Sequence, residues 1–387
     1  MAQQRLLYVV GARPNFVKLA PVVAELSRRS PDADHVVVHT GQHYAPELSE
    51  IFIDQLGLPE PRYRLEIGSG SHAEQTARIM QRLEEVVVAD PPDIAFIAGD
   101  VNSTLAAALV LVKLGVPYGH VESGLRSFDR SMPEEVNRIV TDQVSNLLFT
   151  HSPEARDNLI REGCAVDRIR PVGNTMIDTL VAMRPRIQEL DVAGAPGLAA
   201  GEYLLVTLHR PALVDSPLLA DALAALRLIA GDIAVIFPMH PRTAKAIVRQ
   251  GLDPAGGIRV LEPLDYLKFL SLLEGAAGVL TDSGGIQEES TYLGVPCFTL
   301  RDNTERPVTC EMGTNTLLGL APERIAELPD LLAEGRRRST AAPPGWDGHA
   351  SRRLVETLEA GVPEWEELLP GPPDARAKRF RRPRSAA

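Results

Sequence analysis

Short apolar runs rich in β-branched residues alternate with amphipathic segments along most of this chain. Each run has the length of a buried strand and is closed by turn or polar residues. This alternation is typical of βαβ units, in which helices cover both faces of a parallel sheet. In the first half, the predicted strands are 6–10, 35–38, 94–98, 117–121 and 147–150, and the clearest helical segments are 17–29, 73–88 and 103–114.

The same pattern restarts after about residue 180. The second-half strands are predicted at 203–207, 233–238, 259–261, 278–280 and 296–300, with helices at 216–229, 244–250, 266–274, 285–293 and, last, 350–360. The total of 387 residues suits two or three domains. We therefore predict an α/β fold of two Rossmann-like domains, 1–175 and 176–360, followed by a C-terminal extension, 361–387.

Charge restricts the possible partners. Forty Lys and Arg against 51 Asp and Glu give a net charge of −11, which argues against nonspecific binding of nucleic acid. The end of the chain differs from the rest, because Pro and Arg dominate there and apolar residues are scarce. We expect a solvated, disordered tail and assign it no function. Its basic residues are Arg376, Lys378, Arg379, Arg381, Arg382 and Arg384.

Cysteine usage and hydropathy suggest a cytoplasmic protein. Cys164, Cys297 and Cys310 have no CxxC spacing, which argues against a disulfide framework or a structural zinc site, and we expect all three to be small buried residues. The apolar runs at 6–10 and 105–112 are too short for a signal peptide or a membrane span.

Ligands of parallel sheets bind beyond the carboxyl ends of the strands, so two facing halves would hold a site in the cleft between them. The first predicted strand ends in Gly11-Ala12-Arg13-Pro14-Asn15-Phe16-Val17-Lys18, a glycine turn that enters a helix with two cations. Such a turn suits an anion at a helix N-terminus. The alternative is an ordinary βα turn with surface cations, because the run has neither the Walker nor the GxGxxG spacing.

A second candidate loop follows the strand at 278–280. It reads Thr281-Asp282-Ser283-Gly284-Gly285-Ile286-Gln287-Glu288-Glu289. Ser283, Gly284 and Gly285 would offer backbone N–H groups and a hydroxyl to phosphate oxygens, and Glu289 could accept hydrogen bonds from ribose hydroxyls. An acidic first turn capped by Ser283 is the simpler alternative.

Carboxylates and histidines also follow predicted strands. Asp100, Glu122 and Glu134 come from neighbouring loops and could converge as acid, base and orienting group. His209 and His240 close the first two strands of the second half. Each could be a phosphate partner, a proton donor or simply a partly buried ring. No spacing of a known metal motif occurs, so no metal is predicted.

Nine motifs, in order along the chain, resemble those of non-hydrolysing UDP-N-acetylglucosamine 2-epimerases. The likeness covers about residues 6–358. The motifs are Gly11-Ala12-Arg13-Pro14, Gly41-Gln42-His43, residues 99–104, 120–127 and 133–138, Gly173-Asn174-Thr175-Met176-Ile177-Asp178, Thr207-Leu208-His209-Arg210, residues 281–289, and Arg301-Asp302-Asn303-Thr304-Glu305-Arg306-Pro307.

The resemblance implies a glycosyltransferase-B-like fold, a homodimer, and interconversion of UDP-GlcNAc and UDP-ManNAc without cofactor. In such enzymes a base removes the C2 proton while UDP leaves C1, and the 2-acetamidoglucal is then protonated on the other face. Carried over by motif, the catalytic residues are Asp100, Glu122, Glu134 and His209, with the C2 base unassigned. The implied substrate-binding residues are Arg13, Lys18, His43, Arg138, His240, Phe269 on uracil, Ser283, Gly284, Gly285, Glu289 on ribose, and Arg306.

Some positions depart from the family pattern. Asn15 stands where the family commonly has Glu, and Val101 where it commonly has Thr, so we expect a sugar pocket tuned to a related UDP-sugar. Pro211 and Ala212 follow His209-Arg210 where many bacterial members have Arg-Glu, which argues against activation by a second substrate molecule. A hydrolysing epimerase, a UDP-sugar glycosyltransferase and a non-catalytic sensor are the alternatives. Without the resemblance, Phe269 would equally well be a core residue.

Overall fold

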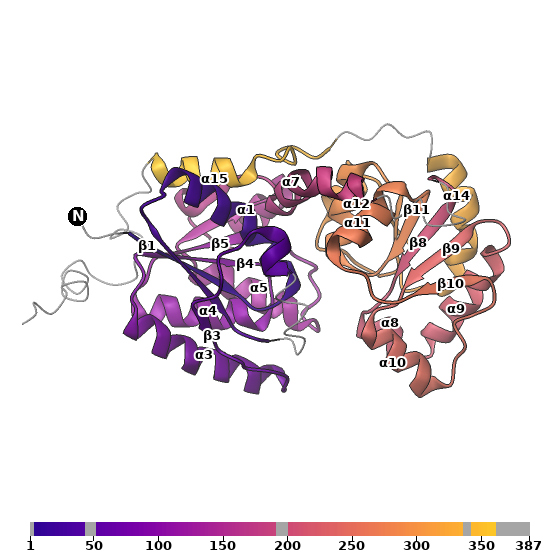
Figure 1. Cartoon of the computed structure of the whole chain (residues 1–387), viewed down its shortest axis with the longest axis horizontal. Coiled ribbons are helices and arrows are strands. Elements are labelled where there is room, and N and C mark those ends of the chain that lie inside the picture. Colours follow the sequence, from indigo (N-terminus) through magenta and orange to yellow (C-terminus); the bar gives the residue numbers. More distant parts are fainter. Residues whose placement is uncertain (1–3, 43–51, 191–199, 336–341, 361–387) are drawn as a thin grey trace, which may run out of the picture. The chain divides into compact units, whose positions relative to one another are not determined.

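The computed structural model describes residues 4–42, 52–190, 200–335 and 342–360. The chain divides into two compact units (Figure 1). Unit 1 comprises Met1–Thr179 and Gly345–Ala387, and unit 2 comprises Leu180–Pro344. The expected basic tail, 361–387, lies outside the described residues.

Unit 1 is built on a seven-stranded parallel sheet in the order β3-β2-β1-β4-β5-β6-β7. The chain winds outward in one direction from β1 and in the other from β4, so the direction switches between these two strands. The strands are β1 (Arg5–Val10), β2 (Asp34–His39), β3 (Tyr63–Arg64), β4 (Ile94–Ala98), β5 (Tyr118–Ser123), β6 (Leu147–Thr150) and β7 (Ile169–Pro171).

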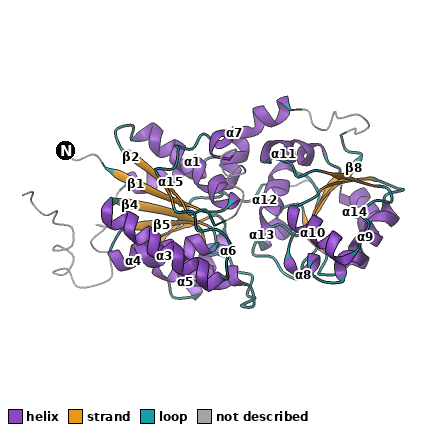
Figure 2. Cartoon of the chain, turned by 60° about the horizontal axis from the view of Figure 1, so that its bottom comes forward, coloured by secondary structure: helices purple, strands orange, loops and turns teal. Residues whose placement is uncertain are grey.

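Helices cover both faces of this sheet. In Figures 1 and 2, α1 and α15 lie on one face, and α3, α4 and α5 lie on the other. The central strands β1 and β4 to β6 are almost wholly buried, as a doubly covered parallel sheet requires. The helices are α1 (Arg13–Arg29), α3 (His72–Ala89), α4 (Asn102–Leu114), α5 (Pro133–Val144), α6 (Pro153–Arg161), the start of α7 (Thr175–Glu189), and α15 (Ala350–Glu359), with a 3₁₀ turn at Val166–Arg168.

Unit 2 repeats the architecture with a six-stranded parallel sheet in the order β10-β9-β8-β11-β12-β13. Its switch of direction lies between β8 and β11. The strands are β8 (Tyr203–Thr207), β9 (Ala234–Pro238), β10 (Ile258–Leu261), β11 (Gly278–Thr281), β12 (Cys297–Thr299) and β13 (Asn315–Leu317).

Within unit 2, α11 and α12 lie on one side of the sheet and α9 and α14 on the other (Figure 1). Leu, Val, Ile and Phe side chains from the strands and from α9 form the main core between sheet and helices. The helices are the remainder of α7, α8 (Pro211–Val214), α9 (Leu218–Ile229), α10 (Pro241–Gln250), α11 (Tyr266–Gly275), α12 (Gly284–Leu293), α13 (Pro307–Glu311) and α14 (Leu328–Gly335), with a 3₁₀ helix at Pro322–Glu327.

The predicted fold class, two Rossmann-like α/β domains in one chain, is confirmed. Each of the ten predicted strands corresponds to an observed strand, with ends shifted by at most two residues. Three short edge strands, β3, β7 and β13, were not predicted. The expectation that all three cysteines are buried was wrong for Cys310, which is exposed at the end of the short α13, whereas Cys164 and Cys297 are buried.

The last described helix does not follow the domain division drawn from the sequence. α15 was expected within 176–360, but it belongs to unit 1 and packs on α1. Its first turn is capped from α7 by Asp178, whose carboxylate accepts the N–H groups of Ala350 (3.0 Å) and Ser351 (2.6 Å). Burial raises the pKa of Asp178. A long return connection of this kind leaves no periodic signal in the sequence.

A close backbone crossing fixes the segment that precedes α15. Gly173 has a left-handed backbone, with φ +93°, and a β-carbon there would lie 2.0 Å from the carbonyl oxygen of Gly345. Next to this crossing, the indole N–H of the buried Trp346 donates to the carbonyl of His151 (2.9 Å). Only glycine at position 173 lets the two backbones meet.

Among the described residues, no helix combines the length and the apolar character that crossing a bilayer requires.

The Gly173 crossing can be tested against a glycine of the same backbone type. Gly163 also has positive φ (+82°), but no atom lies within 4 Å of its β-carbon position. Gly163→Ala should cost about 1–2 kcal/mol of unfolding free energy through backbone strain alone. Gly173→Ala should cost a further ~1–3 kcal/mol through overpacking. Urea unfolding measures both variants, and equal losses would show that the Gly345 contact is unimportant.

Candidate active site

The switch between β1 and β4 brings the first motif of unit 1 against the carboxyl end of β4. Asn15, in the first turn of α1, accepts the N–H groups of Gly11 (3.1 Å) and Ala12 (3.0 Å) through Oδ1 and donates through Nδ2 to the carbonyl of Ala98 (2.7 Å). Both ends of this buried amide are thus used to hold the turn. Asn15, one of the departures from the family pattern, acts on the shape of this loop.

Glu122 lies at the carboxyl end of β5 and is paired with a lysine from α1. Lys18 Nζ is 2.5 Å from Glu122 Oε2, and both side chains are about 95% buried. A buried carboxylate needs such a partner because desolvation of a charge is expensive. Lys18, predicted to bind substrate, therefore neutralises a predicted catalytic residue.

Asp100 follows β4 and is held by α5. Arg138 donates to Asp100 Oδ2 from Nε (2.9 Å), and its Nη2 lies at the same distance. The Nη1 group of Arg138 bonds the buried carboxylate of Glu135, while Asn137 Nδ2 donates to the Asp100 carbonyl (2.8 Å). The Asp100 side chain keeps about 20% of its surface exposed. Asp100 is thus an anchored but accessible carboxylate.

Asp100 and Glu122 belong to one cluster. A β-carbon built at Gly99, the residue before Asp100, would lie 3.0 Å from Lys18 Nζ, so the lysine reaches between the ends of β4 and β5. Two predicted catalytic carboxylates, each beside a cation, therefore meet at the carboxyl edge of the sheet.

Glu134 was expected after a strand, but it lies in a helix instead. It lies half-buried in the first turn of α5, four residues before Arg138, and this spacing puts both on one side of the helix. The neighbouring Glu135 is the buried residue, and its carboxylate accepts from the N–H and hydroxyl of Ser127 (both 2.9 Å).

Arg13, the first residue of α1, is exposed, and its guanidinium lies 5.3 Å from the ring centre of Phe52. His43 lies outside the described residues.

In unit 2, a wholly buried aspartate orients the turn after β8. Asp282 Oδ2 accepts the N–H groups of His209 (2.8 Å) and Arg210 (2.7 Å), and Asp282 Oδ1 lies 3.2 Å from His209 Nδ1. The carboxylate thereby anchors the backbone of this turn and places the imidazole of His209 beside it.

His240 lies beside His209. Their ring centres are 5.2 Å apart. His240 is the N-cap of α10, and its Nδ1 accepts the N–H of Arg242 (3.1 Å), so its Nε2 carries the proton. The prediction that these two histidines close neighbouring strands is confirmed by the ends of β8 and β9.

The glycine loop opens α12 at the switch between β8 and β11. Ser283 is the N-cap but makes no side-chain capping bond, so its hydroxyl is not used in the cap. The first N–H groups of a helix have no partner within the helix. The guanidinium of Arg306 packs on this turn, because a β-carbon at Gly284 would lie 2.6 Å from its Nη1. Gly285 is the second residue of the helix.

Arg306 is buried within a network of charges. It bonds Glu288 and lies 3.2 Å from Glu305. Arg301 pairs with Glu305 (2.6 Å), and Arg210 lies 3.8 Å from the same carboxylate. Three guanidinium groups thus face Glu288 and Glu305, with the Asp282 carboxylate on the backbone of Arg210, and the dipole of α12 favours an anion at its first turn.

Glu289, Tyr266 and Phe269 form the remaining group. Glu289 is buried and accepts the Tyr266 hydroxyl (2.8 Å). Phe269 lies three residues after Tyr266 on α11 and is 93% buried. The three residues bring the start of α11 against α12, within unit 2.

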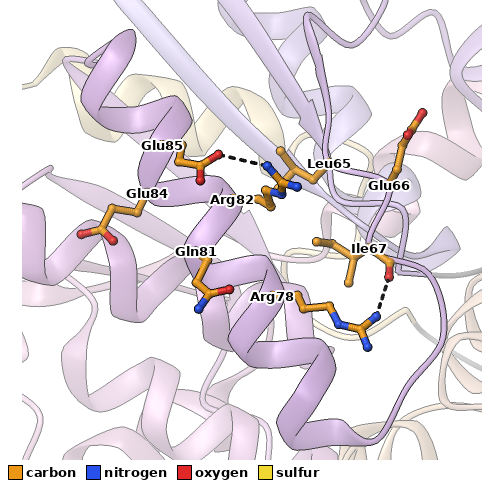
Figure 3. Close-up of a pocket in the computed structure, with 8 residues that line it drawn as sticks. All are labelled: Leu65, Glu66, Ile67, Arg78, Gln81, Arg82, Glu84 and Glu85. Carbon is orange, nitrogen blue, oxygen red and sulfur yellow. Dashed lines mark hydrogen bonds and ion pairs between the residues drawn. The ribbon is translucent and has the colours of Figure 1, made fainter.

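In the described part of the chain, a hollow lies away from the predicted site residues, and no cluster of metal-ligating side chains occurs. A hollow of about 680 Å³ beside α3 is lined by polar residues such as Arg78, Gln81 and Arg82 (Figure 3), none of which was predicted as a site residue. Within the same ranges, His, Cys, Asp and Glu do not gather into a group of three that could hold a metal ion.

Several residues that organise the site were missed by sequence reasoning. Glu135 and Asp282 stand inside quoted motifs, beside residues that were singled out, but received no role. Tyr266 precedes Phe269 by three residues, and helical spacing could have identified it. Asp142, on α5, bonds His120 of β5 across 22 positions (2.8 Å), and no local pattern announces that contact.

The Lys18–Glu122 pair can be tested by a double-mutant cycle. Lys18→Met leaves the Glu122 carboxylate buried without its cation and should cost about 3–5 kcal/mol of unfolding free energy. Lys18→Met combined with Glu122→Gln should recover part of that loss, as urea unfolding measures. Arg82→Ala is the control, because Arg82 and Glu85 are 62% and 67% exposed, and it should cost under ~1 kcal/mol. Strictly additive losses would contradict a buried ion pair.

Comparisons with known proteins agree with this geometry. The family model described as UDP-N-acetylglucosamine 2-epimerase matches residues 25–359. A protein of that name from Methanocaldococcus jannaschii is 40% identical over 92% of this chain and 99% of its own length. A UDP-2,3-diacetamido-2,3-dideoxy-D-glucuronate 2-epimerase from Pseudomonas aeruginosa is 43% identical over 84% of this chain and 90% of its own.

A solved structure gives the same result. The M. jannaschii UDP-GlcNAc 2-epimerase in complex with UDP-GlcNAc and UDP is 38% identical, covers 92% of this chain and all of its own, and has a TM-score of 0.83. The glycosyltransferase-B-like fold class that the resemblance implied is thereby confirmed. By sequence, by fold and by the motifs assembled at the two sheet edges, this chain is an enzyme of the UDP-N-acetylglucosamine 2-epimerase family.

Proposed function

We propose that this enzyme reversibly inverts C2 of UDP-GlcNAc to give UDP-ManNAc, by elimination and re-addition of UDP, without a cofactor. The observation that carries the proposal is the pair of cation-anchored carboxylates, Asp100 and Glu122, at the edge of one parallel sheet. The names of its relatives support the substrate class. The dimer implied by the resemblance stays a prediction.

The chemistry explains why both carboxylates and cations are needed. The C2 hydrogen is not adjacent to a ring carbonyl, so it becomes acidic only as the C1–O bond breaks and positive charge develops at C1. The base then takes the proton, the C2–H electrons form the C1=C2 bond, and UDP leaves with the C1–O pair. Protonation of C2 on the other face and attack of UDP on C1 complete the epimerisation.

The acid–base work is assigned to unit 1. The ammonium of Lys18 pairs with Glu122, and the guanidinium of Arg138 pairs with Asp100. An ionised carboxylate accepts the C2 proton, and a group that has accepted a proton returns one on the opposite face. Glu134, one turn before Arg138 on α5, is the third carboxylate assigned to this step.

Stabilisation of the departing UDP is assigned to unit 2. The guanidinium of Arg306 and the first N–H groups of α12 suit a diphosphate. His209, whose backbone N–H is held by Asp282, is assigned as a hydrogen-bond donor to the leaving group. Glu289 is assigned to the ribose and Phe269 to the uracil.

A second substrate is favoured by a specific observation. The relative that acts, by name, on UDP-2,3-diacetamido-2,3-dideoxy-D-glucuronate is 43% identical, against 40% for the M. jannaschii UDP-GlcNAc enzyme. The same elimination would invert C2 of that sugar, because the reacting atoms are identical. The hydrolysing reaction, which ends in UDP and free ManNAc, is the other outcome to distinguish.

Proton NMR in D₂O tests the proposal. UDP-GlcNAc incubated with the full chain and no added cofactor should yield UDP-ManNAc, with deuterium at C2 of both epimers and no accumulation of free UDP. Asp100→Asn should lower the exchange rate at least ~100-fold. Asp167→Asn, the same change at an exposed aspartate, should not alter it.

Other results would redirect the assignment. Free UDP with ManNAc would indicate the hydrolysing reaction. Turnover of the diacetamido-glucuronate sugar alone would change the substrate but keep the chemistry. An unchanged spectrum with both sugars would contradict the proposed function.

A further inference from the structure

Glu122 occupies an unusual backbone position. Its φ is +69°, in the left-handed region that residues with a side chain avoid, and the pairing of β5 with β6 shifts register between Val121 and Ser123. Such a conformation costs free energy and persists only where surrounding contacts enforce it. The contacts on either side of Glu122 therefore decide where its carboxylate lies.

A single buried carboxylate holds both sides of Glu122. Asp142 Oδ1 accepts from His120 Nδ1 (2.8 Å), two residues before Glu122, and Asp142 Oδ2 accepts the N–H of Gly124 (3.0 Å), two residues after it. The side chain of Asp142 is wholly buried. It thus spans the left-handed residue like a clamp.

The clamp is completed by a second ion pair. Arg126 Nη1 lies 2.8 Å from Asp142 Oδ2, and Arg126 Nη2 lies 2.6 Å from Glu162. Burial raises the pKa of Asp142, but His120 and Arg126 outweigh it, and the net direction is downward. Asp142 is therefore a carboxylate in the folded protein.

His120 extends the clamp to the second catalytic carboxylate. Its Nε2 lies 2.8 Å from the carbonyl oxygen of Gly99, the residue before Asp100. Both ring nitrogens thus face acceptors, and an imidazole satisfies two acceptors only when each nitrogen carries a proton. The ring, which has no exposed surface, therefore joins Asp142 to the loop that carries Asp100.

We infer that Asp142 and His120 are positioning residues for the epimerisation: together they fix Glu122 and Asp100 at the distance and orientation that proton transfer requires. The inference rests on the proposed function. It predicts that loss of either residue slows the chemical step while UDP-GlcNAc binding, which is assigned largely to unit 2, is little changed.

Steady-state kinetics of the full chain with UDP-GlcNAc test this split. Asp142→Asn and His120→Gln should each lower kcat at least ~30-fold and change KM by less than ~3-fold. The matched control is Asp178→Asn, because Asp178 is also a buried, backbone-capping aspartate of unit 1 but contacts neither carboxylate loop. Asp178→Asn should lower the urea midpoint and leave kcat within ~2-fold.

A spectroscopic measurement on the wild-type protein gives a second readout besides turnover. In wild-type protein labelled with ¹⁵N-histidine, both ring nitrogens of His120, assigned by loss of its signals in His120→Gln, should show the chemical shifts of protonated nitrogens. A neutral His120 ring would overturn the inference, as would a folded Asp142→Asn or His120→Gln variant with kcat within ~3-fold of wild type. Absence of wild-type turnover would instead overturn the proposed function itself.

Discussion

The buried carboxylate of Glu122 imposes the constraint around which the edge of unit 1 is organised. Its charge is removed from water and its backbone is left-handed, and each feature alone is unfavourable. Lys18, on α1, pairs with the Glu122 carboxylate, and Asp142, on α5, stabilises the left-handed backbone by accepting the N–H of Gly124. Because these contacts join three elements far apart in sequence, the position of Glu122 depends on the completed fold.

Unit 2 uses a comparable arrangement. Asp282 is buried, accepts two consecutive backbone N–H groups and lies beside a histidine ring, whereas Asp142 accepts one backbone N–H group and bonds a histidine ring. In both halves, therefore, a buried aspartate holds the backbone of a turn next to a histidine. The two aspartates hold different segments. Asp142 holds the loop of Glu122, and Asp282 holds the turn after β8, beside the start of α12.

The fold could be predicted from the sequence wherever burial leaves a pattern. The long central strands are continuous apolar runs, and the motif loops follow them directly, so both were found. The helices α5, α6, α8 and α13 were not predicted. Each has a proline at its first position, where the missing N–H and the fixed φ of proline favour a helix start. The edge strands β3, β7 and β13 have two or three residues, too few for any period.

The candidate site was predictable only in part, for the same reason. Residue types at strand ends indicated Asp100, Glu122 and the Ser283 loop. Pairings such as Lys18 with Glu122 and His120 with Asp142 arise from tertiary packing, and the return of α15 to unit 1 depends on the Gly173 crossing. These contacts join positions that no local window contains, so the sequence alone did not reveal which cation serves which carboxylate.

The central claim is that the C1–O bond breaks and re-forms around a bound UDP. UDP-GlcNAc labelled with ¹⁸O in the bridge between C1 and the β-phosphorus tests it most directly, followed by ³¹P NMR during turnover. The account predicts that the label moves to non-bridging positions of the β-phosphate, in recovered substrate and in product. Epimerised product with the label still wholly in the bridge would contradict this account, in which the C1–O bond breaks and the freed β-phosphate turns before re-addition.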